Sequence, residues 1–216
     1  MSTLTKVALS FIRGTKADRA RTRAIAPSIA LPRPETLGGM PLMQSLAARR
    51  SLREFSPEPV PQILLSSLLW AAFGVNRPEE NGRTAPTARD AQEIDIYVAL
   101  ADGVYIYEPF AHSLSLVAAV DARRITGYQD FVDKAPLDFV YVADHSHMRM
   151  TPADQRRIYS AVTVGAIVQN VYLYCASAGL ATVVRAWLDR DALAKALHLS
   201  EHESIVVAQT VGYPRG

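Results

Sequence analysis

The chain has 216 residues, of which 49% are hydrophobic and 20% are charged, with a formal net charge of +2. This size and composition are typical of one globular domain with an ample core, and they give no indication of a second domain. The only cysteine, Cys175, excludes an internal disulfide and favours a reducing compartment, so we expect a cytoplasmic protein.

Basic residues are concentrated at the N-terminus. Residues 1–33 contain seven of the 23 basic residues but only one of the 21 acidic residues. The rest of the chain therefore has 16 basic and 20 acidic residues. Prolines follow at positions 27, 32 and 34, and we therefore predict that residues 1–40 form an extended arm before one folded domain, residues 41–216. Such an arm can lie across a partner subunit, bind a polyanion or remain disordered.

Two helices are predicted around a cluster of arginines. Apolar residues recur at helical spacing in residues 41–48 and again in residues 62–73, and Gly74 is expected to end the second helix. Between these helices, a stretch of five residues contains three guanidiniums and one hydroxyl, those of Arg49, Arg50, Arg53 and Ser51. Arginine can hold a phosphate with two parallel hydrogen bonds, so this segment has the composition of an anion site. The alternative is a solvated helix end whose arginines pair with nearby glutamates.

Residues 76–92 are polar and rich in turn-forming residues, which predicts a loop of the kind that often carries function. Strands are predicted next, at residues 93–100 and 104–107, joined through Asp102-Gly103 as a hairpin. Two more apolar strands are predicted at residues 138–143 and 204–211. With helices between these strands, the fold class is α+β with a mixed sheet.

Residues 159–177 are almost all apolar or small and predict a helix that ends at Gly179. Gln169 and Asn170 lie in its middle and would be uncompensated in a bilayer, so we expect burial in the core or against a second subunit and no membrane span. Asp189 and Asp191 are explained as caps of the following short helix. No metal site is expected, because the closely spaced histidines lack further ligands.

Five motifs, taken together, resemble the FMN-dependent nitroreductase family, and they occur in the family's order. The similarity is closest to the short members grouped with the SagB-type dehydrogenases, and it covers roughly residues 31–214. It implies a sheet flanked by helices in an intertwined homodimer. The motifs are residues 49–55 (RRSLREF), 68–74 (LLWAAFG), 83–89 (RTAPTAR), 179–182 (GLAT) and 210–214 (TVGYP).

The resemblance also implies three groups of FMN-binding residues. The first is the arginine cluster, with Arg49 and Ser51 at the phosphate and ribityl end, Arg50 beside them, Arg53 near the N1/O2 edge and Arg215 as a further phosphate candidate. The second matches a loop that reaches the flavin from the neighbouring subunit: Pro86, Thr87, Ala88, Asp90 and Gln92. The third matches a segment whose backbone lies against the isoalloxazine ring: Val183, Val184 and Arg185.

By this resemblance, the chain is expected to take a hydride from NAD(P)H onto FMN and to reduce a small acceptor such as a nitroaromatic or a quinone, in ping-pong turnover. An alternative is an FMN-dependent dehydrogenase that oxidises a dedicated metabolite or a peptide-derived azoline ring. A second alternative is a non-enzymatic protein that binds nucleic acid through the basic arm. Only Phe11 interleaves with those basic residues, so stacking on bases is poorly supported and no nucleic-acid partner is expected.

Overall fold

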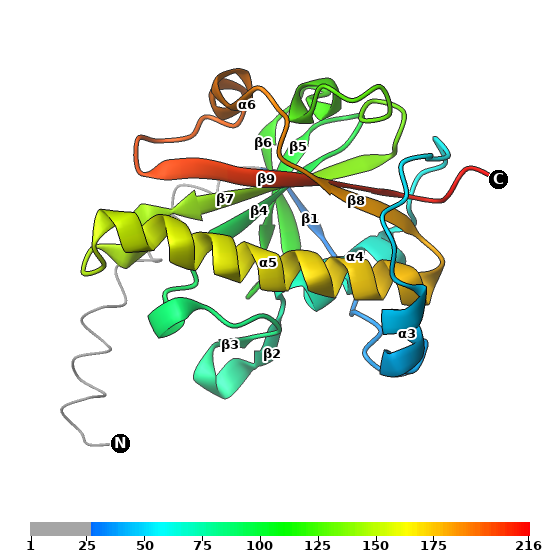
Figure 1. Ribbon diagram of the computed structural model, residues 1–216, viewed down its shortest axis with the longest axis horizontal. Coiled ribbons are helices and arrows are strands. Elements are labelled where there is room, and N and C mark those ends of the chain that lie inside the picture. Colours follow the sequence, from blue (N-terminus) through cyan, green and yellow to red (C-terminus); the bar gives the residue numbers. More distant parts are fainter. Residues whose placement is uncertain (1–26) are drawn as a thin grey trace.

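A computed structural model of the chain describes residues 27–216, and its central element is a seven-stranded sheet (Figure 1). The strand order is β1-β6-β5-β4-β7-β9-β8, and every described pairing in it is antiparallel. The strands are β1 (Ser28–Ala30), β4 (Ile94–Ala99), β5 (Val104–Glu108), β6 (Ser113–Ala118), β7 (Leu137–Asp144), β8 (Ala181–Arg185) and β9 (Glu203–Gly212). A separate small hairpin pairs β2 (Val75–Arg77) with β3 (Gly82–Arg83).

The helices agree closely with the sequence pattern. They are α3 (Leu42–Ala48), α4 (Gln62–Phe73), α5 (Ala153–Ala178) and α6 (Arg190–Ala196), with short 3-10 turns η1 (Pro78–Glu80), η2 (Ala88–Asp90), η3 (Arg123–Thr126) and η4 (His145–Met148). Gly179 ends α5 in the left-handed conformation, with φ 70°. Asp189 caps α6, because its carboxylate accepts a hydrogen bond from the Ala192 amide at 2.9 Å. The α+β class is therefore confirmed.

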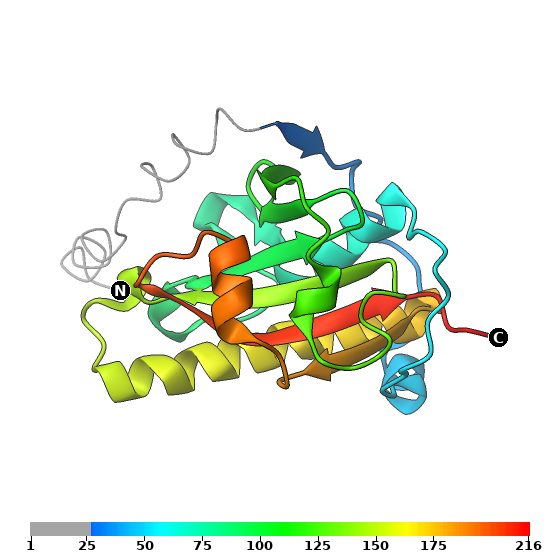
Figure 2. The ribbon, with the colours of Figure 1, turned by 90° about the horizontal axis from the view of Figure 1, so that it is seen from above.

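The sheet is covered on both faces. Phe139 and Tyr141 of β7 pack in a core cluster with residues of α4 and α5, whereas Val140 and Val142 pack in a second cluster with Leu193 of α6. Successive side chains of a strand point to opposite faces, so a strand buried on both faces reads as a continuous apolar run, which is why β7 was predictable. Figure 2 shows α6 and α5 on opposite sides of the sheet.

Helix α5 runs along one face of the sheet and contacts both α3 and α4 (Figure 1). Val164 and Ile167 point into the core, while Ile158 and Val162 are 60% and 67% exposed. In the part of the chain that the structure describes, α5 is one helix whose length and composition would allow it to cross a membrane. Its packing against the sheet explains the same apolar composition, since core helices share it.

The segment after β1, which we call the strap (residues 31–40), lies along α4 and reaches the end of α5. The Ser66 hydroxyl donates to the Pro32 carbonyl at 2.5 Å and lies 2.7 Å from His112 Nε2. Farther along, the Met40 amide donates to the Ser177 hydroxyl at 2.7 Å. The strap therefore belongs to the packed body, and the earlier part of the predicted basic arm, residues 1–26, lies outside the described residues.

Some local expectations differ from the structure. The sheet was expected to be mixed, but its described strand pairs are antiparallel, and β1, β6 and β8 were not predicted. Gly74 ends α4 as predicted, and it does so in an extended conformation, with φ −71°.

Candidate functional site

The arginine cluster lies on a segment, residues 49–56, that is joined to the far end of the chain. The Leu52 amide donates to the Thr182 carbonyl of β8 at 3.1 Å, and Phe55 forms an isolated bridge with Pro214. The Arg215 amide donates to the Glu54 carbonyl at 3.1 Å. This pairing places Arg215 next to Glu54, at the C-terminal end of the arginine segment, which the sequence could suggest only through the family resemblance.

Tyr172 of α5 joins the cluster to strand β8. Its side chain is 6% exposed, and its hydroxyl lies 2.8 Å from the Ser51 hydroxyl and accepts a hydrogen bond from the Val184 amide at 3.0 Å. The Arg49 guanidinium lies over the Tyr172 ring, 5.2 Å from its centroid, at a distance typical of a cation–π contact. Two of the three predicted groups therefore meet at one residue that sequence reasoning did not single out, because nothing local to Tyr172 marks it.

The guanidiniums of the cluster are available to a ligand. Arg50 and Arg53 are exposed and Arg49 is half-buried. Within residues 27–216, no ion pair involves any of these three side chains, so pairing with the neighbouring glutamates is not observed there. Guanidiniums without an acid partner among the described residues, beside a serine hydroxyl, form a donor set that fits a phosphorylated mononucleotide.

The three predicted residues of strand β8 differ in their surroundings. Val183 is buried and Val184 is 36% exposed, with its amide directed to Tyr172. The Arg185 side chain points to the opposite face, where Nη2 donates to Asp138 Oδ1 at 2.5 Å and Nη1 donates to the Thr126 carbonyl at 2.7 Å. The Arg185 side chain is therefore committed to this buried pair and does not reach the arginine cluster.

The buried Arg185–Asp138 pair lies close to the backbone of Gly127, and the pKa values of both side chains are shifted. A Cβ at Gly127 would lie 2.0 Å from Arg185 Nη1, so glycine is required there. Burial raises the pKa of Asp138 to about 6, although the Arg185 cation lowers it in part. Burial likewise lowers the pKa of Arg185. The pair fixes β8 against β7 and β9.

The predicted flavin loop is held by Gln92. This residue is 7% exposed; its amide nitrogen donates to Asp90 Oδ1 at 2.9 Å, and its amide oxygen accepts from Arg83 Nε at 3.0 Å. Its backbone amide donates to the Thr87 hydroxyl at 3.1 Å. The backbone of this loop has three residues with positive φ, Arg89 at 57°, Asp90 at 54° and Gln92 at 48°. Residues other than glycine rarely adopt such angles. Gln92 thus shapes the loop from inside, whereas Pro86, Thr87, Ala88 and Asp90 lie at its surface.

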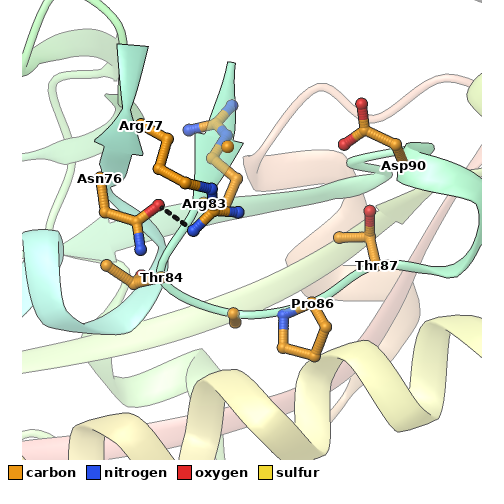
Figure 3. Close-up of a pocket in the computed structure, with 9 residues that line it drawn as sticks. Asn76, Arg77, Arg83, Thr84, Pro86, Thr87 and Asp90 are labelled. Carbon is orange, nitrogen blue, oxygen red and sulfur yellow. Dashed lines mark hydrogen bonds between the residues drawn. The ribbon is translucent and has the colours of Figure 1, made fainter. Parts of the chain in front are cut away.

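A depression of about 400 Å³ opens between this loop and the β2–β3 hairpin. Figure 3 shows Asn76 and Arg77 on one side of it, with Thr87 and Asp90 on the loop side. Its lining residues are Asn76, Arg77, Gly82, Arg83, Thr84, Ala85, Pro86, Thr87 and Asp90.

Within one protomer, the loop and the arginine cluster lie on different sides of α5. The Asn170 side chain donates to the Thr84 carbonyl at 3.4 Å, whereas Tyr172, two residues later, contacts Ser51. Helix positions two apart point about 200° apart, at 3.6 residues per turn. The structure therefore brings together Arg49, Ser51 and Val184 at Tyr172, and within the chain it does not add the loop to them.

The remaining titratable groups give no sign of a metal centre. In the described part of the chain, no group of three or more histidine, cysteine, aspartate or glutamate side chains is placed to hold a metal ion. His145 Nε2 lies 2.9 Å from the Ser204 hydroxyl, and His147 Nε2 lies 3.4 Å from Asp144 Oδ2. Cys175 is fully buried, and burial raises the pKa of its thiol, so it is an inert core side chain.

The fold and the candidate site define an α+β protein with a guanidinium-rich cluster beside the edge strand of an antiparallel sheet. The model of the nitroreductase family matches residues 46–213, and the chain belongs to this family. It is accordingly an oxidoreductase of the flavoprotein class. The predicted family membership is confirmed.

Three similar proteins illustrate the relationship. A nitroreductase of Methanocaldococcus jannaschii is 32% identical over 157 residues, which cover 68% of this chain and 79% of the relative. The crystal structure of a nitroreductase from Ralstonia eutropha is 50% identical, with a TM-score of 0.84 and coverage of 88% of this chain and 90% of that one. The NADPH:FMN oxidoreductase from Vibrio harveyi, solved with NAD⁺, shares the fold at 18% identity, with a TM-score of 0.60 and coverage of 81% and 69%.

Proposed function

We propose that the chain holds FMN at the arginine cluster and catalyses the reduction of a small oxidised acceptor, such as a nitroaromatic or a quinone, by NAD(P)H. The observation that carries this proposal is the meeting of Arg49, Ser51 and the Val184 amide at Tyr172, with guanidiniums that no described carboxylate neutralises. Family membership and the name of the Vibrio harveyi relative support the same cofactor and electron donor.

The residues of the cluster divide the work of binding. Arg49, Ser51 and Arg50 would hold the phosphate and ribityl end, with Arg215 adding charge from the C-terminal segment. Arg53 would place a cation near the pyrimidine edge, where it favours negative charge and so makes hydride acceptance easier. When bound, FMN supplies the hydride chemistry, and the protein supplies placement and electrostatics.

For a nitroaromatic acceptor, one turnover converts the nitro compound, NAD(P)H and one proton into the nitroso compound, NAD(P)⁺ and water. Two electrons leave the nicotinamide as a hydride, and the nitrogen–oxygen bond that breaks delivers its oxygen to water. Donor and acceptor use one surface in turn if the site holds a single slot, which gives ping-pong kinetics.

We also propose that the working unit is a homodimer. The exposed side of α5 carries Ile158 and Val162, and neighbouring α3 exposes Leu42 and Met43 at 64% and 75%. An exposed apolar surface of this extent is typical of a subunit interface. A second copy packed there offers a way for the loop of one protomer to approach the arginine cluster of the other.

Reconstitution with flavin tests the proposal. We expect purified protein to be yellow or to become yellow on adding FMN, and NAD(P)H to bleach the flavin absorbance under anaerobic conditions. Loss of a charge-assisted hydrogen bond costs about 1.5–3 kcal/mol, so Arg49→Gln should weaken FMN binding at least tenfold. Arg124→Gln, on the opposite face of the sheet, is the control. Protein that remains colourless in excess FMN would refute the proposed cofactor.

The same preparations test the dimer. Light scattering after gel filtration should give twice the chain mass of 23.6 kDa for the wild type. Val162→Lys places a charge on the exposed face of α5 and should shift the protein toward the monomer. A wild type that is monomeric at micromolar concentration but binds FMN fully would contradict the proposed role of the second copy.

A further inference from the structure

Arg83 is a buried cation that the proposed flavin site does not use. It is 8% exposed, and its guanidinium lies between two aromatic rings, 5.0 Å from the centroid of Phe73 and 4.6 Å from that of Phe110. Nε donates to Gln92 Oε1 at 3.0 Å, and Nη1 donates to the Phe73 carbonyl at 3.2 Å. These contacts fix the guanidinium rigidly but use only part of its five donors.

No carboxylate pairs with this cation in the part of the chain that the structure describes. Asp95, Asp90 and Glu108 act on it only at longer range, and no ion pair involves its nitrogens among residues 27–216. Burial accordingly lowers the pKa of Arg83 to about 10. Buried charges are usually paired, because an uncompensated ion loses its hydration without replacement. A buried cation with no carboxylate partner among the described residues is suited to an anionic ligand.

Arg83 also lines the depression of about 400 Å³ next to the loop. Its Nη2 makes no hydrogen bond to the described residues, so this donor is left for a ligand in the depression. A second guanidinium, that of Arg77, lies at the same depression with its side chain 51% exposed, where it donates to Asn76 Oδ1 at 2.9 Å and pairs with Glu80 at 3.3 Å (Figure 3). Exposed pairs of this kind contribute little, so Arg77 can turn to a ligand at small cost.

We propose that the depression between the β2–β3 hairpin and the loop binds the carboxylate of the electron acceptor, and that the enzyme therefore prefers one-ring acceptors that carry a carboxylate. The role as acceptor rests on the proposed function, whereas carboxylate binding rests on Arg77, Arg83 and the depression alone. The volume is within the range of small-molecule sites, about 300–1,000 Å³.

The charges at the rim favour a carboxylate over a phosphate. Asp90 lines the depression opposite Arg77, and its negative charge opposes a dianion more strongly than a monoanion. The planar fork of a guanidinium matches the two oxygens of a carboxylate. Pro86 and Thr87 line the same depression and belong to the loop expected at the flavin, so an acid held by its carboxylate directs its other end toward that loop.

Two matched acceptors and two matched variants test the proposal on the FMN-loaded protein. 4-Nitrobenzoate carries the carboxylate, and 4-nitrobenzamide is its neutral analogue. Arg77→Gln removes a cation at the depression, and Arg124→Gln is the control, because its side chain is 54% exposed and likewise pairs with one acid, Asp133. We expect wild type and Arg124→Gln to show a KM for the acid at least tenfold below that for the amide. Arg77→Gln should raise the KM for the acid about tenfold and leave kcat and the values for the amide unchanged.

Calorimetry with benzoate gives a readout that does not depend on turnover. Benzoate should bind the wild type, Arg77→Gln should weaken it about tenfold, and Arg83→Lys should weaken it while retaining a folded protein. If no turnover occurs but benzoate binds in this pattern, the carboxylate site stands and the proposed function fails. Three results would each overturn the proposal. They are an equal rise of KM for the acid and the amide in Arg77→Gln, no binding of benzoate, or displacement of benzoate by equimolar inorganic phosphate.

Discussion

The hydroxyl of Tyr172 is expected to couple the arginine cluster to strand β8, and a double-mutant cycle can measure this coupling. Tyr172→Phe removes the hydroxyl that lies 2.8 Å from the Ser51 hydroxyl and 3.0 Å from the Val184 amide, and it keeps the ring beneath Arg49. Each hydrogen bond contributes about 0.5–1.5 kcal/mol to stability, so the free energy of unfolding should fall by about 1–2 kcal/mol. The hydrogen bond from the Val184 amide should contribute the smaller share of this loss, because Val184 is 36% exposed and water can replace the lost hydroxyl.

Ser51→Ala removes the other partner and should cost about 1 kcal/mol. Because the two single variants break one shared bond, the double variant should be about 1 kcal/mol more stable than the sum of the two losses predicts. Urea denaturation of the flavin-free protein, at one fixed protein concentration, gives these values. Tyr159→Phe is a suitable control, since that hydroxyl makes one long contact of 3.3 Å to Gln155 and should cost under about 0.5 kcal/mol. Losses that add within about 0.3 kcal/mol would show that Ser51 and Tyr172 are not bonded.

Three further outcomes follow from buried groups. Gly127→Ala places a Cβ 2.0 Å from Arg185 Nη1 and should lower the melting temperature markedly, whereas Gly165→Ala, with nothing within 4 Å, should not lower it. The pKa of Asp138 is raised from 3.8 to about 6, so the folded state keeps a proton that the unfolded state loses, and stability should fall by roughly 2–3 kcal/mol as pH rises from about 4 to 6. The urea midpoint of the wild type should therefore fall as pH rises across this range, and that of Asp138→Asn should not. An equal fall in Asp138→Asn would assign the effect to another group. Cys175 should not react with a thiol reagent until the protein unfolds, and rapid labelling of native protein would show that the core around it opens.

The sequence predicted the elements whose patterns are local. Helix α4 was predicted from apolar residues at helical spacing, α5 from a long run of apolar and small residues that stops at Gly179, and β7 from an apolar run. Strand β6 alternates serine and leucine over residues 113–116 and was nevertheless missed, whereas the ATVVR sequence of β8 has no alternation of polar and apolar residues. Strand direction is set by pairing between distant segments, which is why the antiparallel order of the sheet could not be predicted.

The candidate site was predicted in part for the same reason. The arginine cluster is contiguous, so its composition was visible in the sequence. Tyr172 and Arg83 acquire their roles only through partners brought close by the fold, such as Ser51, which is 121 positions from Tyr172. Gln92 was expected at the flavin, but the structure places its side chain inside the loop, because its amide satisfies donors and acceptors there at once.

The strap is joined to the sheet by a short chain of hydrogen bonds that runs from Tyr107 through His112 and Ser66 to the Pro32 carbonyl. A serine hydroxyl has one proton, and Ser66 gives it to the Pro32 carbonyl, so His112 must carry its own proton on Nε2 to donate to Ser66. In the neutral imidazole, Nδ1 lies 3.0 Å from the Tyr107 hydroxyl and accepts a hydrogen bond from it. Burial lowers the pKa of His112, although a hydrogen bond to the Pro32 backbone raises it in part, in keeping with this neutral form. A charged ring would leave two donors facing each other at Tyr107 unless the phenol turns, so the seam between the strap and the sheet resists protonation of His112.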